Sequence, residues 1–225
     1  MSPREVVSND QIVRYIDIIS NSFGVRENIS KPLLKEMQKL FSAKQFSQCI
    51  LKIKLFFNLP MTLRIGYLRE KKSSSDAHGF GLFNLNFLGR GHLNPFNLFC
   101  EPEKEPASVM MPSNLPSFLQ PDFKDATITM YVRNSLKLES FETFAKCVGH
   151  EMAHIVLYAT RHQLKGSEVA TDLTAMILGF SEIYRKGRKS FRSRFGYLND
   201  EQFALAYRTI QKKRGDGFFR RWFGI

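Results

Sequence analysis

The stretch from residue 147 to residue 172, CVGHEMAHIVLYATRHQLKGSEVATD, constrains the fold of this chain more than any other. It contains two pairs of metal-binding residue types, each pair spaced four residues apart: His150 with His154, and Glu168 with Asp172. Side chains four residues apart share one face of an α-helix, because the helix has about 3.6 residues per turn. The spacing therefore predicts two helices, each with a pair of ligand-type side chains on one face.

The first of these helices is predicted to begin near Ser140 and to continue through Ile155. Serine and the glutamate two residues later suit the first turn of a helix. His150 and His154 would lie within reach of a single ion, and catalytic zinc sites keep three protein ligands and one open position. Glu151 lies beside the histidines, where its carboxylate can take a proton from a water molecule at that position. By composition, a chance match to this motif has a probability of roughly one per cent or less.

A third ligand is available soon after the histidines. Residues 159 to 166, ATRHQLKG, contain a helix-ending glycine and little periodicity, so the first helix should stop there. Ser167 can cap a second helix, SEVATDLTAMILGF, with Glu168 in its first turn. Glu168 would complete the metal site, while Asp172 would accept a hydrogen bond from the outer nitrogen of a ligating histidine and fix its tautomer. Two alternatives stay open here. One is Asp172 as the third ligand, and the other is His162, a loop histidine that by default is exposed.

The two motifs resemble those of the gluzincin metallopeptidases, which have HExxH followed by a glutamate helix of pattern ExxxD. HEMAH and EVATD match these patterns residue for residue. The resemblance implies one zinc ion (Zn²⁺) per chain, bound by His150, His154 and Glu168. It implies that Glu151 is the general base and that Asp172 supports the metal ligands from outside the set that binds the ion. The implied reaction is hydrolysis of a peptide bond in a peptide or protein substrate by metal-activated water.

The resemblance covers residues 126 to 180, so it includes the segment before the first helix. In ATITMYV, Ile128, Met130 and Val132 alternate with threonine and tyrosine, which predicts a half-buried strand over residues 126 to 132. In gluzincins the strand at this place lies at the edge of a sheet and pairs with an extended substrate. The resemblance therefore implies that residues 126 to 132 form an edge strand.

The N-terminal part, residues 1 to 46, is predicted to be helical. Apolar residues recur at helical spacing after Asn9-Asp10, and again over residues 30 to 46. Residues 50 to 70 contain short apolar runs around an asparagine and a proline, which favours strands joined by a turn.

The rest of the chain is less regular until its last part. Residues 71 to 76 are predicted to form a loop and residues 100 to 122 an extended connection, while residues 79 to 99 show no assignable pattern. Residues 195 to 215 are predicted to form a capped amphipathic helix. Four side chains are candidates for stabilising a transition state, with packing as their default role: Tyr158, His162, Tyr197 and Tyr207.

The net charge of +12 is concentrated near the C-terminus. Residues 185 to 225 contain twelve lysines and arginines against three acidic residues, a net charge of +9, and end in GFFRRWFGI. Such a composition is typical either of a solvated or self-docked tail or of a segment that binds an anionic partner. The alternative to a peptidase is therefore a zinc-fold regulatory protein that binds nucleic acid or a membrane surface through this segment, with little or no peptidase activity.

Taken as a whole, residues 1 to 225 are predicted to form a single α+β, zincin-like metallopeptidase domain. It would combine N-terminal helices, a small mixed sheet, an active-site helix and a glutamate helix. The sequence has neither a signal-peptide pattern nor an apolar run of the roughly 18 residues that cross a bilayer, which favours a cytoplasmic protein and leaves secretion as an effector open. Its three cysteines form no CxxC pair and suit a reducing compartment.

Overall fold

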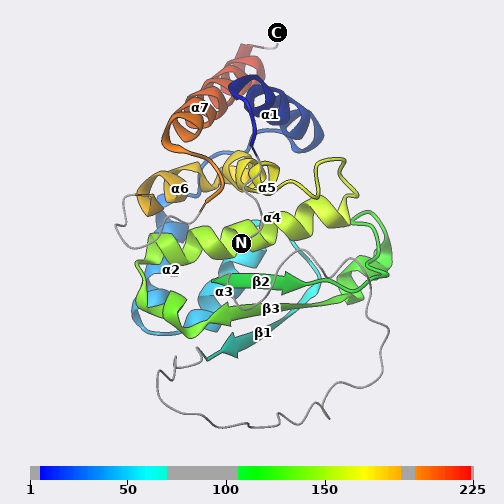
Figure 1. The fold of residues 1–225 in the computed structure, drawn as a ribbon, viewed down its shortest axis with the longest axis vertical. Helices are drawn as coiled ribbons and strands as arrows, with labels where there is room; N and C mark the ends of the chain where they lie inside the picture. Colours follow the sequence, from blue (N-terminus) through cyan, green and yellow to red (C-terminus); the bar gives the residue numbers. More distant parts are fainter. Residues whose placement is uncertain (1–5, 70–105, 189–195, 224–225) are drawn as a thin grey trace, which may run out of the picture.

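The computed structural model describes residues 6–69, 106–188 and 196–223, with the side chains of the last helix described as far as Gly215. The helices and strands are α1 (Asn9–Phe23), α2 (Lys31–Ser42), α3 (Phe46–Phe56), β1 (Thr62–Leu68), β2 (Ala107–Met110), β3 (Thr127–Arg133), α4 (Phe141–Ala159), α5 (Glu168–Ala175), α6 (Ser181–Gly187) and α7 (Asp200–Phe223). The fold is α+β. In Figure 1, α4 runs between the three-stranded sheet and helices α5 and α6, and α1 and α7 lie together beyond these helices.

The two predicted N-terminal helices are confirmed as α1 and α2. Ser8 caps α1 in a capping box with Gln11, and the hydroxyl of Ser30 accepts a hydrogen bond from the backbone N–H of Leu33 at the start of α2. The apolar stripe of α1 is fully buried: Ile12, Ile16 and Ile19. Because these residues recur every three or four positions, helix periodicity predicts this packing face correctly.

The prediction of strands over residues 50 to 70 is wrong for its first half, which belongs to helix α3. Ile50 and Ile53 are fully buried, and they share one helix face with Cys49. A short, dense apolar run fits a strand or a buried helix equally well, and here packing of α3 against α2 and α4 decides for the helix. The predicted turn and second strand are confirmed, because Asn58 has a positive φ of 55° and β1 follows.

The three strands form a mixed sheet in the order β1-β3-β2. β1 runs parallel to β3 with Thr62 opposite Thr127, and β2 runs antiparallel to β3 with Ala107 opposite Val132. The predicted strand β3 is confirmed, but its assignment as an edge strand is wrong, because it is the central strand. Alternating burial occurs in both kinds of strand, so the pattern could not separate them.

Strand β2 is the sheet edge that lies against α4 (Figure 1). It is only four residues long and lies in the proline-rich region predicted as an extended connection. That prediction is correct for the loop before the 3₁₀ turn Pro121–Asp125 and misses β2. The predictions for residues 71–76 and 79–99 fall outside the described residues.

Helix α4 passes through the centre of the molecule, and fifteen of its nineteen residues are buried. The hydroxyl of Ser140 caps its first turn by accepting a hydrogen bond from the backbone N–H of Thr143. The helix ends at Ala159, at the start of the stretch 159 to 166 in which it is predicted to stop, and Arg161 adopts a positive φ of 52° where the chain turns. Ser167 then caps α5 as predicted, by accepting a hydrogen bond from the backbone N–H of Ala170.

A short π-helical segment, Met176–Phe180, links α5 to α6, and α7 follows further along the chain. Phe203, Ala206 and Ile210 of α7 are buried, which confirms the predicted inward face, although Tyr207 is only partly buried. None of the helices in the described ranges combines the length and the apolar character that a membrane crossing needs.

Candidate metal centre

Three side chains from α4 and α5 bring their donor atoms together at one point. Nε2 of His150 lies 3.0 Å from Oε2 of Glu168, and Nε2 of His154 lies 3.2 Å from the same oxygen. One ligand atom from each of the three residues lies within 4.8 Å of the other two. The helix spacing thus places the histidines on one face of α4, and Ser167 begins α5 so that the first turn of α5 faces them.

Two of the donor separations are close to those of a tetrahedral metal site. With zinc–ligand bonds of about 2.1 Å, two ligands of a tetrahedral site lie roughly 3.4 Å apart. The separations of 3.0 and 3.2 Å between the nitrogens and the shared oxygen are close to that value. The side chains of both histidines are mostly buried and that of Glu168 is about a quarter exposed, so solvent reaches the group through Glu168.

Asp172 contacts the ring nitrogen of His150 that does not face Glu168. Its Oδ1 lies 2.8 Å from Nδ1 of His150 and also accepts a hydrogen bond from the hydroxyl of Tyr184 at 3.1 Å. Its Oδ2 accepts a hydrogen bond from the backbone N–H of Tyr197 at 2.9 Å. A buried carboxylate whose oxygens are both bonded in this way holds the ring of His150 at a fixed angle.

The same helix supports His154 through Thr171. Thr171 is buried and directly precedes Asp172 in the sequence. Its hydroxyl lies 3.3 Å from Nδ1 of His154. Consecutive residues of α5 thus hold the outer nitrogens of the two histidines, while Nε2 of each histidine faces Glu168. This leaves Nε2 of both rings for an ion.

The electrostatics of the site favour positive charge between the carboxylates. Burial raises the pKa of Glu168, but hydrogen bonds and charge interactions with His150 and His154 outweigh it and hold that pKa well below the usual range. Burial likewise opposes ionisation of Asp172, whose pKa is nevertheless lowered by its hydrogen bond to His150. Burial lowers the pKa of His150, and hydrogen bonds to the two carboxylates raise it well above its usual value. Both carboxylates are therefore ionised at neutral pH.

Two further charged residues of α4 border the centre. Glu151 is buried beside His150, where its negative charge contributes to the raised pKa of that histidine. Lys146, one turn earlier, is only 4% exposed, and burial lowers its pKa although the charge of Asp172 partly opposes this. Glu151 is not among the donors that converge with Glu168, which agrees with a role distinct from metal binding.

The alternative third ligand, His162, lies away from the centre. Its Nδ1 accepts a hydrogen bond from the backbone N–H of Leu164 at 3.2 Å, and its Nε2 lies 3.3 Å from the hydroxyl of Ser22. The expectation that His162 is exposed is wrong, because the ring is buried against Phe23 and lines a cavity of about 430 Å³. Burial lowers its pKa, which keeps this imidazole neutral.

Of the three tyrosines proposed to stabilise a transition state, one lies at the metal centre and two lie elsewhere. Tyr197 lies at the centre, with its ring stacked on that of His150 at a centroid distance of 5.6 Å. The hydroxyl of Tyr207 bonds to Glu182, and the ring of Tyr158 lies below the ammonium group of Lys165. Packing contacts therefore account for Tyr207 and Tyr158.

Sequence reasoning missed four members of the centre: Thr171, Tyr184, Lys146 and the backbone N–H of Tyr197. Thr171 carries a usable signal, because it lies three residues after Glu168 and thus on the same helix face. Tyr184 and Tyr197 are 12 and 25 residues from Asp172, and only the path of the chain brings them there.

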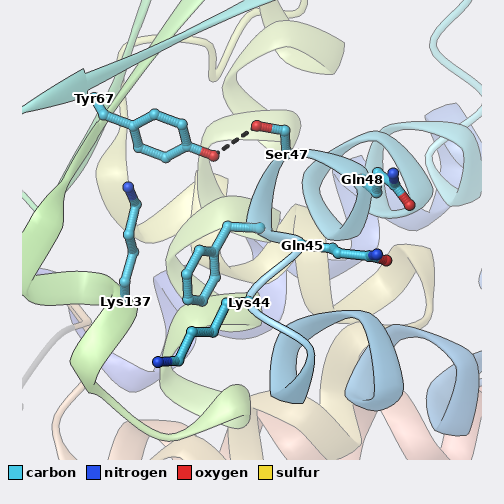
Figure 2. A pocket seen from close by; sticks show the side chains of 7 residues that line it. Lys44, Gln45, Ser47, Gln48, Tyr67 and Lys137 are labelled. Atoms are coloured by element: carbon cyan, nitrogen blue, oxygen red, sulfur yellow. Dashed lines mark hydrogen bonds between the residues drawn. The ribbon is translucent and has the colours of Figure 1, made fainter.

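A second pocket, of about 270 Å³, opens at the start of α3 (Figure 2). The hydroxyls of Tyr67 and Ser47 lie 2.8 Å apart there, and the ammonium group of Lys137 lies 3.3 Å from the centre of the Tyr67 ring. The lining residues include none of the metal-centre side chains. This pocket is therefore separate from the candidate metal centre.

Four of the described cations between Arg185 and Gly215 have partners within the chain. Arg214 is buried and donates hydrogen bonds to the carbonyl of Arg26 and the hydroxyl of Ser181. Three further cations form ion pairs: Arg185 with Glu182, Arg188 with Asp200, and Lys213 with Asp17. Fewer cations are thus free for an anionic partner than the charge count suggests.

Comparison of the chain with protein-family models, with curated proteins and with solved structures finds no match. The function of the chain is therefore inferred from the residues and the geometry of the centre.

Proposed function

We propose that this chain is a zinc metallopeptidase with a zincin-like fold of gluzincin type. The observation that carries the proposal is the convergence of His150, His154 and Glu168, whose ligand atoms lie within 4.8 Å of one another. A histidine pair on one helix and a glutamate from the first turn of a second helix supply three protein ligands. This is the number that leaves one position of a tetrahedral zinc site open to water or substrate.

The surrounding residues support this function. Asp172 and Thr171 hold the outer nitrogens of the histidines, an arrangement that orients metal ligands and raises their basicity. When bound, zinc supplies Lewis-acid chemistry, because it lowers the pKa of a bound water and polarises a carbonyl oxygen. Within the chain, the lowered pKa of Glu168 keeps its carboxylate ionised and ready to bind a cation.

Glu151 is the general base in this proposal. It follows His150 directly on α4, and its charge acts on that histidine, although Glu151 does not belong to the group of donors. It takes the proton from the attacking water and passes it to the leaving amine of the peptide bond. Such proton transfer commonly contributes about 10² to 10⁴ in rate.

The substrate strand in this proposal is β2 rather than β3. β2 is at the edge of the sheet and lies against α4, and an extended peptide can add to a sheet edge through main-chain hydrogen bonds. Met110, at the end of β2, is 46% exposed. The pairing role that the gluzincin resemblance gives to residues 126–132 therefore moves to Ala107–Met110.

The experiment that tests the function compares protein N-termini in extracts treated with the wild-type protein and with Glu151→Gln. We expect new N-termini with the wild type and none with the variant, which keeps side-chain size and helix propensity but loses the proton acceptor. Identical N-termini in the two samples would contradict a peptidase that uses Glu151. Bound zinc without any Glu151-dependent cleavage would instead favour the regulatory, partner-binding alternative.

A further inference from the structure

The segment that precedes α7 reaches back to the metal centre. The backbone N–H of Tyr197 donates to Oδ2 of Asp172 at 2.9 Å. The ring of the same residue stacks on His150, with an angle of 22° between the ring planes. One residue from a segment distant in sequence thus contacts both a candidate ligand and the carboxylate that supports this ligand.

Gly196 makes this close approach possible. Its φ of +131° is a conformation that residues with a side chain rarely adopt. A Cβ at this position would lie 2.9 Å from Nζ of Lys146 and 3.6 Å from Oδ2 of Asp172. A larger residue would be strained at this φ and would displace the ammonium group of Lys146, which disturbs the backbone that carries Tyr197.

The segment is also held from its other side. The guanidinium of Arg188 donates a hydrogen bond to the carbonyl of Leu198 at 2.9 Å and pairs with Asp200 at the start of α7. Leu198 itself is buried in the core. Tyr197 is therefore fixed by contacts that do not depend on the histidines.

A stacked ring restricts His150 in a way that a hydrogen bond alone cannot. The bond from Nδ1 to Asp172 fixes one edge of the imidazole but allows the ring plane to rock about that bond. Contact with the face of Tyr197 opposes this rocking. A ligand whose orientation is fixed before binding loses less conformational freedom when the metal binds.

We infer that Tyr197 is a positioning residue of the metal centre. Its ring stacks on His150 and its backbone N–H holds Asp172, and Gly196 allows the backbone to approach this closely. The inference rests on the proposed metal function and deepens it. It also makes the segment before α7 a part of the centre, although this segment belongs to the part of the chain with the basic excess.

The test measures the zinc dissociation constant by competition with a chromophoric chelator, together with the visible spectrum of the Co²⁺-loaded protein. Tyr197→Phe keeps the ring and should bind zinc within twofold of wild type. Tyr197→Ala and Gly196→Ala should weaken zinc binding by about 10-fold or more, as changes to the partners of metal ligands do, and should alter the Co²⁺ spectrum. If Tyr197→Ala does not fold, Tyr197→Leu removes the stacking with less loss of volume.

Tyr207→Ala is the matched control, because Tyr207 is an aromatic residue of α7 that bonds to Glu182 and not to the centre. It should leave zinc binding unchanged. Zinc affinity within twofold of wild type for Tyr197→Ala, or an equal loss for Tyr207→Ala, would overturn the inference. If Tyr197→Ala binds zinc as tightly as wild type and Glu151-dependent cleavage is intact, only this inference is overturned. If the wild-type protein binds no zinc, the proposed metal function is overturned as well.

Discussion

The hydroxyl of Thr171 lies 3.3 Å from Nδ1 of His154 and donates its own hydrogen to the carbonyl of Ser167 at 3.0 Å. A hydroxyl has a single hydrogen, so Thr171 must act as acceptor toward His154. The imidazole therefore donates a hydrogen from Nδ1 to Thr171, and its Nε2 is the nitrogen that faces Glu168 and that a metal would take. Through Thr171, α5 determines which nitrogen of His154 is available to a metal.

Thr171→Val tests this relationship. Valine keeps the shape of threonine but cannot accept the hydrogen from Nδ1, so we expect zinc affinity to fall about 10-fold. Thr171→Ser, which keeps the hydroxyl, should bind zinc nearly as well as wild type. Chelator competition measures both constants, and equal affinities for the valine and serine variants would show that the hydroxyl has no role.

Asp172→Asn probes the support of His150. The amide group cannot satisfy all three donors, because wherever its NH₂ points it faces either the backbone N–H of Tyr197 or the donors of His150 and Tyr184. We expect zinc affinity or activity to drop about 10- to 100-fold. Tyr184→Phe removes one donor and keeps the carboxylate, so its effect should be smaller. A larger loss for Tyr184→Phe than for Asp172→Asn would contradict this order.

The parts of the centre that helix periodicity controls could be predicted from the sequence. Pairs spaced four residues apart place His150 beside His154, and a serine cap places Glu168 in a first turn. The rest depends on tertiary structure. The approach of Tyr197 to His150 requires Gly196 to adopt a positive φ and α7 to pack against α1, and no local pattern reports either event.

The fold also combines elements that local sequence patterns predict with elements that depend on tertiary structure. Helices α1, α2, α4 and α5 follow from apolar spacing and capping residues. The identity of α3 and the central position of β3 do not, because burial of Ile50 and the choice of strand neighbours depend on segments distant in sequence. Strand β2 is too short to show a pattern at all.

Gly179→Ala should destabilise the turn between α5 and α6. Gly179 has a φ of +109°, and an added Cβ would lie 2.5 Å from the carbonyl oxygen of Glu27. The backbone strain alone costs about 1–3 kcal/mol, so the free energy of unfolding in urea should fall by at least that amount. Gly166→Ala is the control, because a Cβ there meets nothing within 4 Å. Equal stabilities for the two variants would contradict the predicted strain.

Cys49 should resist alkylation in the folded protein. Its side chain is fully buried, and burial raises the pKa of the thiol to about 12, so very little thiolate exists at pH 8. The raised pKa also means that the thiol contributes stability below about pH 9, which is lost as the pH rises toward 12. Peptide mass spectrometry after treatment with N-ethylmaleimide should find Cys49 unmodified at pH 8 and modified in urea. Rapid modification at pH 8 without urea would contradict its burial.

Zinc content tests the central claim most directly, by elemental analysis of purified wild type, of the double variant His150→Ala with His154→Ala, and of His162→Ala. His162 is the matched control, because it is a buried histidine that bonds to Ser22 and Leu164 away from the centre. The account predicts about one zinc per chain in wild type and in His162→Ala, and almost none in the double variant, since Glu168 alone is too few ligands. Full zinc in the double variant would contradict it.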